Sequence, residues 1–182
     1  MFSQFEKVGR SLFEEGLVSS HGGNLSIRQG DTLHITHRGC PLGHLGRADV
    51  VETNVERNTR STPFCSSELP VHRAIYRKTS AQAIVHAHPS HAVALTFVEN
   101  ELVPADIEGR MAFPRVPIVG QEYLSGPGEL CEEIADAFGD SRVVLVKGHG
   151  SFAIAQLLEE AYYLTSILEH SCRVLFLRRS LR

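Results

Sequence analysis

The chain has 182 residues, a formal net charge of −3, 42% hydrophobic residues and 21% charged residues, which is an ordinary globular balance. This length predicts a single domain over residues 1–182 with a sizeable core. The small negative charge does not favour a nucleic-acid binder, and no apolar run approaches the roughly 20 residues of a membrane span. The first ten residues lack the apolar core of a signal peptide, so we expect a cytoplasmic protein with no membrane or nucleic-acid partner. Its four scattered cysteines are expected to be free thiols.

The first third of the chain predicts a helix followed by a hairpin. Apolar residues at helical spacing indicate a helix over residues 2–17, and a loop rich in serine and glycine follows it. Alternating apolar residues predict strands over 24–28 and 32–36, and the turn residues between them indicate a hairpin. A loop rich in glycine and histidine over 37–47 and a short strand over 49–54 follow.

The remainder alternates between helices and buried strands. Ser66 or Ser67 is the expected N-cap of a helix that ends near Arg77, and a β-branched run predicts a strand over 83–88 that Pro89 terminates. The further expected elements are a short helix over 91–98, a loop with short strands over 101–119, a helix over 127–138, a buried strand over 142–147 and a long helix over 159–177. Together they predict a three-layer α/β/α domain with a central, mostly antiparallel sheet flanked by helices.

Three histidines form a candidate metal site. Because side chains alternate along a strand, His86 and His88 point to the same side of the sheet. His149 follows a buried strand within a Gly-His-Gly sequence, where small neighbours leave its ring accessible. Each histidine alone is more simply an ordinary core or turn residue. Together they supply the three nitrogen ligands that a catalytic zinc site with an open fourth position uses.

Glu68 is expected near the start of a helix. A carboxylate there can simply stabilise the helix dipole, which is the ordinary role of such a residue. Alternatively, Glu68 can act as a general acid/base beside the metal or as a displaceable fourth ligand.

Three short stretches could bind an anion. They are Gly22-Gly23-Asn24, Arg38-Gly39 and Ser66-Ser67, which offer backbone N–H groups, a positive charge and two hydroxyls before a helix. Each stretch alone is also common turn chemistry. Their position around the candidate metal site favours a phosphate site.

These motifs, in this order and spacing, resemble the class II aldolase/adducin family from about Glu6 to Leu177. The resemblance implies a class II aldolase-like fold, and a C4 homotetramer with each active site at a subunit interface. It implies that His86, His88 and His149 bind one Zn²⁺ or another divalent metal per subunit, and that Glu68 is the catalytic glutamate, which can also ligate the free metal. The positions that match the family's phosphate site are Gly23, Asn24, Gly39, Ser66 and Ser67. Arg38 stands where the aldolases have threonine and is expected to strengthen phosphate binding.

The function implied by the resemblance is zinc-dependent cleavage of a ketose 1-phosphate of the L-fuculose 1-phosphate type. The products are dihydroxyacetone phosphate and an aldehyde, formed by zinc-stabilised enediolate chemistry. Epimerases, decarboxylases and dehydratases of the family are the alternatives, and glutamate at position 68 favours aldolase over epimerase, where relatives carry aspartate. A non-catalytic adducin-like interaction module is a further alternative, but such modules lack the histidines kept here.

Two departures concern the aldehyde end of the implied substrate. The aldolases contribute a tyrosine from the neighbouring subunit in a stretch that corresponds to residues 104–110, where this chain has no tyrosine and Glu108 is the nearest match. The sequence given ends at Arg182, and by the same resemblance we expect no counterpart of the tail that carries a second functional tyrosine.

Overall fold

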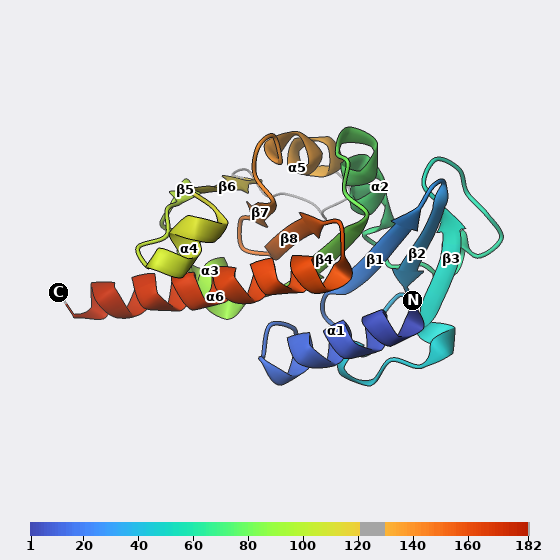
Figure 1. Cartoon of the computed structure of the whole chain (residues 1–182), viewed down its shortest axis with the longest axis horizontal. Coiled ribbons are helices and arrows are strands. Elements are labelled where there is room, and N and C mark those ends of the chain that lie inside the picture. The colour runs from blue at the N-terminus through green and yellow to red at the C-terminus, as the bar shows by residue number, and fades with distance from the viewer. Residues whose placement is uncertain (121–129, 182) are drawn as a thin grey trace.

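The structure, a computed structural model, describes residues 1–120 and 130–181. Its centre is a mixed sheet of eight strands in the order β3-β2-β1-β4-β8-β7-β6-β5 (Figure 1). The strands are β1 (Asn24–Gln29), β2 (Thr32–Thr36), β3 (Val50–Asn54), β4 (Ala83–Ala87), β5 (Glu101–Leu102), β6 (Val116–Val119), β7 (Val143–Val146) and β8 (Gly150–Ala155). Only β6 and β7 pair in parallel among the strands of the described ranges, so the predicted, mostly antiparallel sheet is confirmed.

Helices cover both faces of this sheet (Figure 1). One face carries α2 (Leu69–Lys78) and α5 (Cys131–Ala137), and the other carries α1 (Phe2–Glu14), α3 (Ser90–Leu95) and α6 (Leu158–Ser180), with α4 (Ile107–Ala112) packed against α6. Short 3₁₀ turns occupy Leu42–His44, Arg47–Asp49 and Thr62–Phe64. None of the helices in the part of the chain that the structure describes is both long and apolar enough to cross a membrane.

Strand β4 separates two hydrophobic cores and determines where the His86 side chain points. Ala83, Val85 and Ala87 pack into the core beneath α1 and α6, whereas Ile84 packs into the core beneath α2 and α5. The alternation therefore turns His86 toward the α2 face of the sheet. Burial of apolar residues on both faces contributes about 25 cal/mol per Å² and holds the strand in this register.

The register of β4 with its neighbours assembles the site. Asn24 at the start of β1 pairs with His86, and Ser26 pairs with Ile84. On the other side, β8 pairs antiparallel with β4, so that Ala87 faces Ser151. The turn before β8 therefore returns to the carboxyl end of β4, where the histidine pair lies.

Several predicted elements differ from the structure in extent. The first helix ends at Glu14 rather than residue 17, and the last helix runs through Ser180. Strand β8 was not predicted, and helix α4 lies in the segment 101–119 that was expected to contain only loop and strand. The Asp106 side chain accepts a hydrogen bond from the Gly109 N–H and caps α4, a local signal that the neighbouring prolines obscured.

Two further expectations concern the helix predicted over 127–138 and the cysteines. That helix begins at Cys131 in the structure, and its predicted start at Pro127 lies outside the described residues. No disulfide joins any of the four cysteines, all of which lie within the described residues, as expected. Three of them are buried, where they pack as small apolar side chains.

Candidate active site

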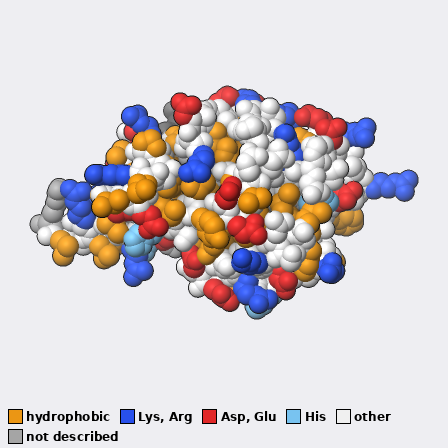
Figure 2. Space-filling view, in the orientation of Figure 1, with side chains coloured by type: hydrophobic (Ala, Val, Ile, Leu, Met, Phe, Trp, Pro, Cys, Tyr) orange, Lys and Arg blue, Asp and Glu red, His pale blue; other side chains and the backbone are white. Residues whose placement is uncertain are grey.

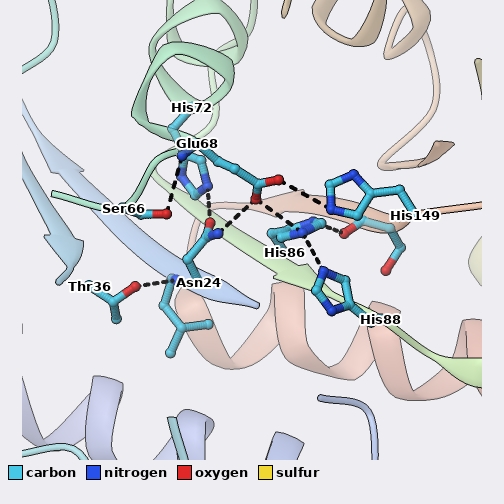
Figure 3. Close-up of polar contacts among 10 residues, drawn as sticks. Asn24, Thr36, Ser66, Glu68, His72, His86, His88 and His149 are labelled. Atoms are coloured by element: carbon cyan, nitrogen blue, oxygen red, sulfur yellow. Dashed lines mark hydrogen bonds and ion pairs between the residues drawn. The ribbon is translucent and has the colours of Figure 1, made fainter. Parts of the chain in front are cut away.

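Polar side chains gather in a cavity of about 310 Å³ at the end of β4, beside the start of α2 (Figure 3). The cavity is lined by His21, Gly22, Gly23, Asn24, His37, Gly39, Ser66, Ser67, Glu68, His86, His88 and His149. The structure therefore brings together every predicted site residue except Arg38, whose side chain is exposed and does not line the cavity. His21 and His37 were not predicted, although both lie in the glycine-containing loops that carry the expected anion site.

The three candidate metal ligands converge from two segments of the chain. The ring centroid of His86 lies 4.8 Å from those of both His88 and His149, and the His88 and His149 centroids lie 5.1 Å apart. One candidate ligand atom from each of these residues lies within 4.8 Å of the others. The fold thus brings His149 to the histidine pair at the end of β4, as the ligand arrangement requires.

The hydrogen bonds of His86 show that this cluster suits a cation. Its Nδ1 must donate to the Ser151 carbonyl oxygen, 2.9 Å away, because a carbonyl only accepts. In the neutral ring, Nε2 then carries a lone pair, and it lies 2.9 Å from His88 Nε2 and 3.0 Å from a Glu68 oxygen. The His86 lone pair thus faces a Glu68 oxygen, which only accepts when the carboxyl is ionised, and a second imidazole nitrogen at hydrogen-bond distance, an arrangement that a divalent metal stabilises.

Burial also keeps the histidine rings in the neutral form that metals bind. Desolvation lowers the pKa of His86 and His88, and it lowers the pKa of His149 to about 4, with the His88 charge as a smaller cause. These rings therefore carry lone pairs at neutral pH. His149 Nδ1 is buried without a hydrogen-bond partner among the described residues. The other ring nitrogen, Nε2, lies 3.3 Å from Glu68 Oε1.

Glycine is required where the backbone approaches His88. A Cβ added at Gly150 would lie 2.3 Å from the Ala87 carbonyl oxygen and 2.8 Å from the His88 ring. A Cβ added at Gly22 would lie 2.8 Å from His88 Nδ1. Gly22 in the loop before β1 and Gly150 at the start of β8 thus make room for the His88 ring, which explains the small residues around this site.

Glu68 lies at the centre of the polar cluster. The residue is the N-cap of α2, and its amide donates to Ser66 Oγ at 3.3 Å. The expectation that Ser66 or Ser67 caps the helix, with Glu68 in the first turn, is therefore wrong, because Pro70 places the helix start later. Glu68 Oε2 accepts a 2.7 Å hydrogen bond from Asn24 Nδ2 and contacts His86.

The environment of Glu68 suits proton transfer. Only 6% of the residue is exposed, and burial raises the pKa of its carboxyl from 4.5 to about 7, although the Asn24 hydrogen bond opposes this. A pKa near neutrality allows the carboxyl both to accept and to release a proton at physiological pH.

The predicted anion-binding residues lie on the other side of Glu68. Gly23 and Gly39 have positive φ angles of 76° and 70°, and both line the cavity together with Ser66 and Ser67. The Asn24 amide already donates to Glu68 and accepts from His72 at 2.6 Å, which leaves it one N–H for a ligand. Arg38 lies between two lining residues, and its backbone N–H donates to the Phe64 carbonyl oxygen.

Sequence reasoning missed His72, Ser26 and Tyr76, which are buried and linked to Asn24 by hydrogen bonds. The one local signal was the spacing of Glu68 and His72, four residues apart near the start of one helix.

Comparison with known proteins gives consistent relatives. A family model for the class II aldolase and adducin N-terminal domain matches residues 3–176. A protein of Methanococcus maripaludis named L-fuculose phosphate aldolase is 30% identical over 99% of this chain and 98% of its own length. The crystal structure of L-fuculose-1-phosphate aldolase from Thermus thermophilus superposes with a TM-score of 0.90 and 35% identity, covering 99% of this chain and 95% of that chain. An Escherichia coli protein named 3-oxo-tetronate 4-phosphate decarboxylase is 26% identical over 96% of this chain and 85% of its own length.

Proposed function

The chain belongs to the class II aldolase and adducin family, and from this premise we propose that it is a zinc-dependent aldolase acting on a ketose 1-phosphate. The substrate class is of the L-fuculose 1-phosphate type, and the products are dihydroxyacetone phosphate and an aldehyde. The names of full-length relatives support this reading. The observation that carries it is the convergence of three neutral histidines on a buried glutamate with a pKa near 7.

His86, His88 and His149 are proposed to hold one Zn²⁺ per subunit, with Glu68 as a ligand that the substrate displaces. A divalent metal in this position supplies Lewis-acid polarisation of a carbonyl oxygen and balances negative charge that develops nearby. The Ser151 carbonyl fixes the tautomer and the orientation of His86, which is the role that such outer hydrogen bonds have in metal sites.

Glu68 is proposed to carry the proton in this reaction. When the bond between C3 and C4 of the sugar breaks, the C4 hydroxyl passes its proton to a base at the aldehyde end, for which Glu108 of a neighbouring subunit is the first candidate. The C3 carbon keeps the electron pair and must gain a proton. A carboxyl with a pKa near 7 can deliver that proton and remove it again in the reverse direction. Its hydrogen bond to Asn24 keeps Oε2 occupied and leaves Oε1 directed toward His149.

The phosphate is proposed to bind at Gly23, Asn24, Gly39, Ser66 and Ser67, with Arg38 adding positive charge from the loop between two lining residues. Backbone N–H groups and hydroxyls suit phosphate oxygens, and these residues share the cavity with the histidines. The distance between the phosphate end and the metal end would then fix which carbon of the sugar lies beside Glu68.

The aldehyde end is proposed to be completed by a neighbouring subunit of a homotetramer. A second hollow of about 440 Å³ opens on the other side of the metal ligands and is lined by His88, Ser90, Val93, Gly148 and His149. Exposed apolar side chains on α4 support an interface, since Ile107 is 79% exposed and Met111 is 83% exposed. Glu108 lies between them and is the first candidate to replace the tyrosine of the aldolases.

The test begins with metal analysis of the purified protein, followed by incubation with a panel of ketose 1-phosphates. Release of dihydroxyacetone phosphate from at least one sugar, abolished by a chelator and restored by Zn²⁺, is the expected result. The panel includes 3-oxo-tetronate 4-phosphate because a decarboxylase is among the relatives. Release of CO₂ from that compound without any dihydroxyacetone phosphate from the sugars would contradict the aldolase assignment.

A further inference from the structure

A continuous row of buried side chains leads from the interior of the protein to Glu68. Tyr76 Oη lies 2.8 Å from Ser26 Oγ, which lies 2.6 Å from His72 Nδ1. His72 Nε2 lies 2.6 Å from Asn24 Oδ1, and Asn24 Nδ2 lies 2.7 Å from Glu68 Oε2 (Figure 3). We call these four residues, Tyr76, Ser26, His72 and Asn24, the polar row.

Two structural elements create this row. Strand β1 presents Asn24 and Ser26 on the same side, two residues apart. Helix α2 presents His72 and Tyr76 on one face, and its N-cap Glu68 precedes His72 by the same interval of four residues. The polar side chains of the strand therefore lie opposite those of the helix. Ser26 and His72 have no exposed surface, and Tyr76 is 1% exposed.

The hydrogen bonds in the row can run in only one direction when Glu68 is ionised. A carboxylate only accepts, so Asn24 must donate its N–H and present its oxygen to His72. That oxygen also only accepts, so His72 must carry its proton on Nε2. In a neutral ring Nδ1 then accepts from the Ser26 hydroxyl, and the Ser26 oxygen accepts from the Tyr76 hydroxyl.

The surroundings of His72 keep its ring neutral. The ring is packed edge-on against Phe152, with centroids 6.1 Å apart, and both its nitrogens contact uncharged groups. Burial without an anionic partner lowers the pKa of His72 to about 3.

We propose that His72 is a positioning residue that fixes the orientation of the Asn24 amide and, through it, the carboxyl of Glu68. Without a donor at Nε2, the Asn24 amide can rotate by 180° and place its oxygen against Glu68. The carboxyl would then lose the hydrogen bond that holds Oε2. Without that bond, Oε1 would no longer be kept in place for the substrate. This role rests on the proposed function of Glu68 as proton carrier.

Two substitutions at position 72 separate positioning from simple packing. Glutamine places its amide nitrogen close to where the imidazole carries Nε2, so His72→Gln can still donate to Asn24. Asparagine places its amide close to the position of Nδ1, so His72→Asn reaches Ser26 but not Asn24. Both variants are neutral and polar, and both remove the ring from the same helix.

The activity measured is exchange of the C3 hydrogen of dihydroxyacetone phosphate with solvent, as kcat and KM. His72→Gln should stay close to wild type, whereas His72→Asn should lose about 10–100-fold in kcat with KM and bound zinc unchanged. Equal activity of the two variants, or equal losses that follow a common fall in thermal stability, would overturn the proposal. The same pair of substitutions at His34, which is buried on β2 and does not line the cavity, is the control and should leave kcat unchanged.

A second measurement needs no activity and no folded variant. In the full-length protein labelled with ¹⁵N-histidine, His72 should show a protonated Nε2 and an unprotonated Nδ1 throughout the neutral pH range. A ring protonated on Nδ1, or on both nitrogens, would overturn the proposal. If the wild-type protein neither exchanges the C3 hydrogen of dihydroxyacetone phosphate nor cleaves any substrate, the proposed function fails. The NMR measurement still determines the tautomer of His72 in that case.

Discussion

At the scale of single residues, the site depends on which groups can give protons and which can only accept them. The Ser151 carbonyl determines the tautomer of His86, and the Asn24 amide occupies one oxygen of Glu68. Neither constraint is visible in a list of ligand types. Together they leave the Nε2 lone pair of His86 3.0 Å from an oxygen of Glu68 that also only accepts when the carboxyl is ionised, a contact that a bound cation would stabilise.

The first residue-scale prediction concerns metal binding. Replacing His88 with alanine should remove most of the bound metal, because it removes one of the three imidazoles proposed to hold the ion and leaves an empty ligand position in a site shaped around that ring. Metal content of the purified protein, measured by atomic emission, checks this. The control is His44→Ala, an exposed histidine outside the cavity. Full occupancy in the His88 variant would show that His88 is not a ligand.

The second residue-scale prediction is a pH dependence of stability. Burial raises the pKa of Glu68 from 4.5 to about 7, so between these pH values the folded chain holds a proton that the unfolded chain releases. The free energy of unfolding of the metal-free protein should therefore fall with rising pH, by roughly 3 kcal/mol over the whole window, relative to Glu68→Gln.

Urea unfolding at several pH values, in the presence of a chelator, measures this difference. The histidines, whose lowered pKa values act in the opposite direction, are common to both proteins and cancel in the comparison. Parallel pH profiles for the wild type and the variant would show that the folded protein does not raise the pKa of Glu68.

At the scale of elements, the sequence predicted the hairpin, strand β4 and the long helix because each has a strong local pattern. Strand alternation placed His86 on the α2 face, whereas His88 lies one residue beyond β4, where its ring centroid is 4.8 Å from that of His86. The polar row could not be predicted, since Ser26 and His72 lie 46 residues apart and meet only through the packing of α2 on β1. Strand β8 was missed because it follows the Gly-His-Gly turn, where the predicted strand had already ended.

The prediction at this scale concerns the close contact of the β8 turn with β4. Gly150→Ala should destabilise the protein by about 1–3 kcal/mol and reduce bound metal, because its Cβ would lie 2.3 Å from the Ala87 carbonyl oxygen. Thermal unfolding and metal content check both effects. Gly46→Ala is the matched control, since its Cβ would meet nothing nearer than 3.5 Å and its φ of −96° suits alanine. Similar behaviour of the two variants would refute the packing argument.

At the scale of the whole molecule, the end of the molecule formed by α4 and the last turns of α6 carries much of the exposed apolar surface. The C-terminal half of α6 extends beyond the sheet next to α4 (Figure 1), and apolar side chains interspersed with Lys and Arg cover that end (Figure 2). The exposed apolar residues in this region are Phe97, Val98, Val103, Ile107, Met111, Phe176, Leu177 and Leu181. Surfaces of this kind are typical of protein interfaces.

The whole-molecule prediction is a homotetramer whose assembly needs this surface. Met111→Glu should shift the protein toward smaller species in light scattering, because it places a charge in an apolar contact. Activity should fall with assembly while the metal content of each chain stays unchanged, since the histidines all come from one subunit. A catalytically competent monomer, in the wild type or in the variant, would contradict inter-subunit active sites.

The most direct test of the central claim, that Glu68 carries a proton beside a histidine-bound metal, is exchange of the C3 hydrogen of dihydroxyacetone phosphate with solvent. This half-reaction requires no knowledge of the aldehyde. The zinc-loaded wild type should catalyse it, and Glu68→Gln, which keeps the shape of the side chain but cannot exchange a proton, should be slower by about 10²–10⁴-fold. Exchange at the wild-type rate by a Glu68→Gln variant that retains its zinc would contradict the account.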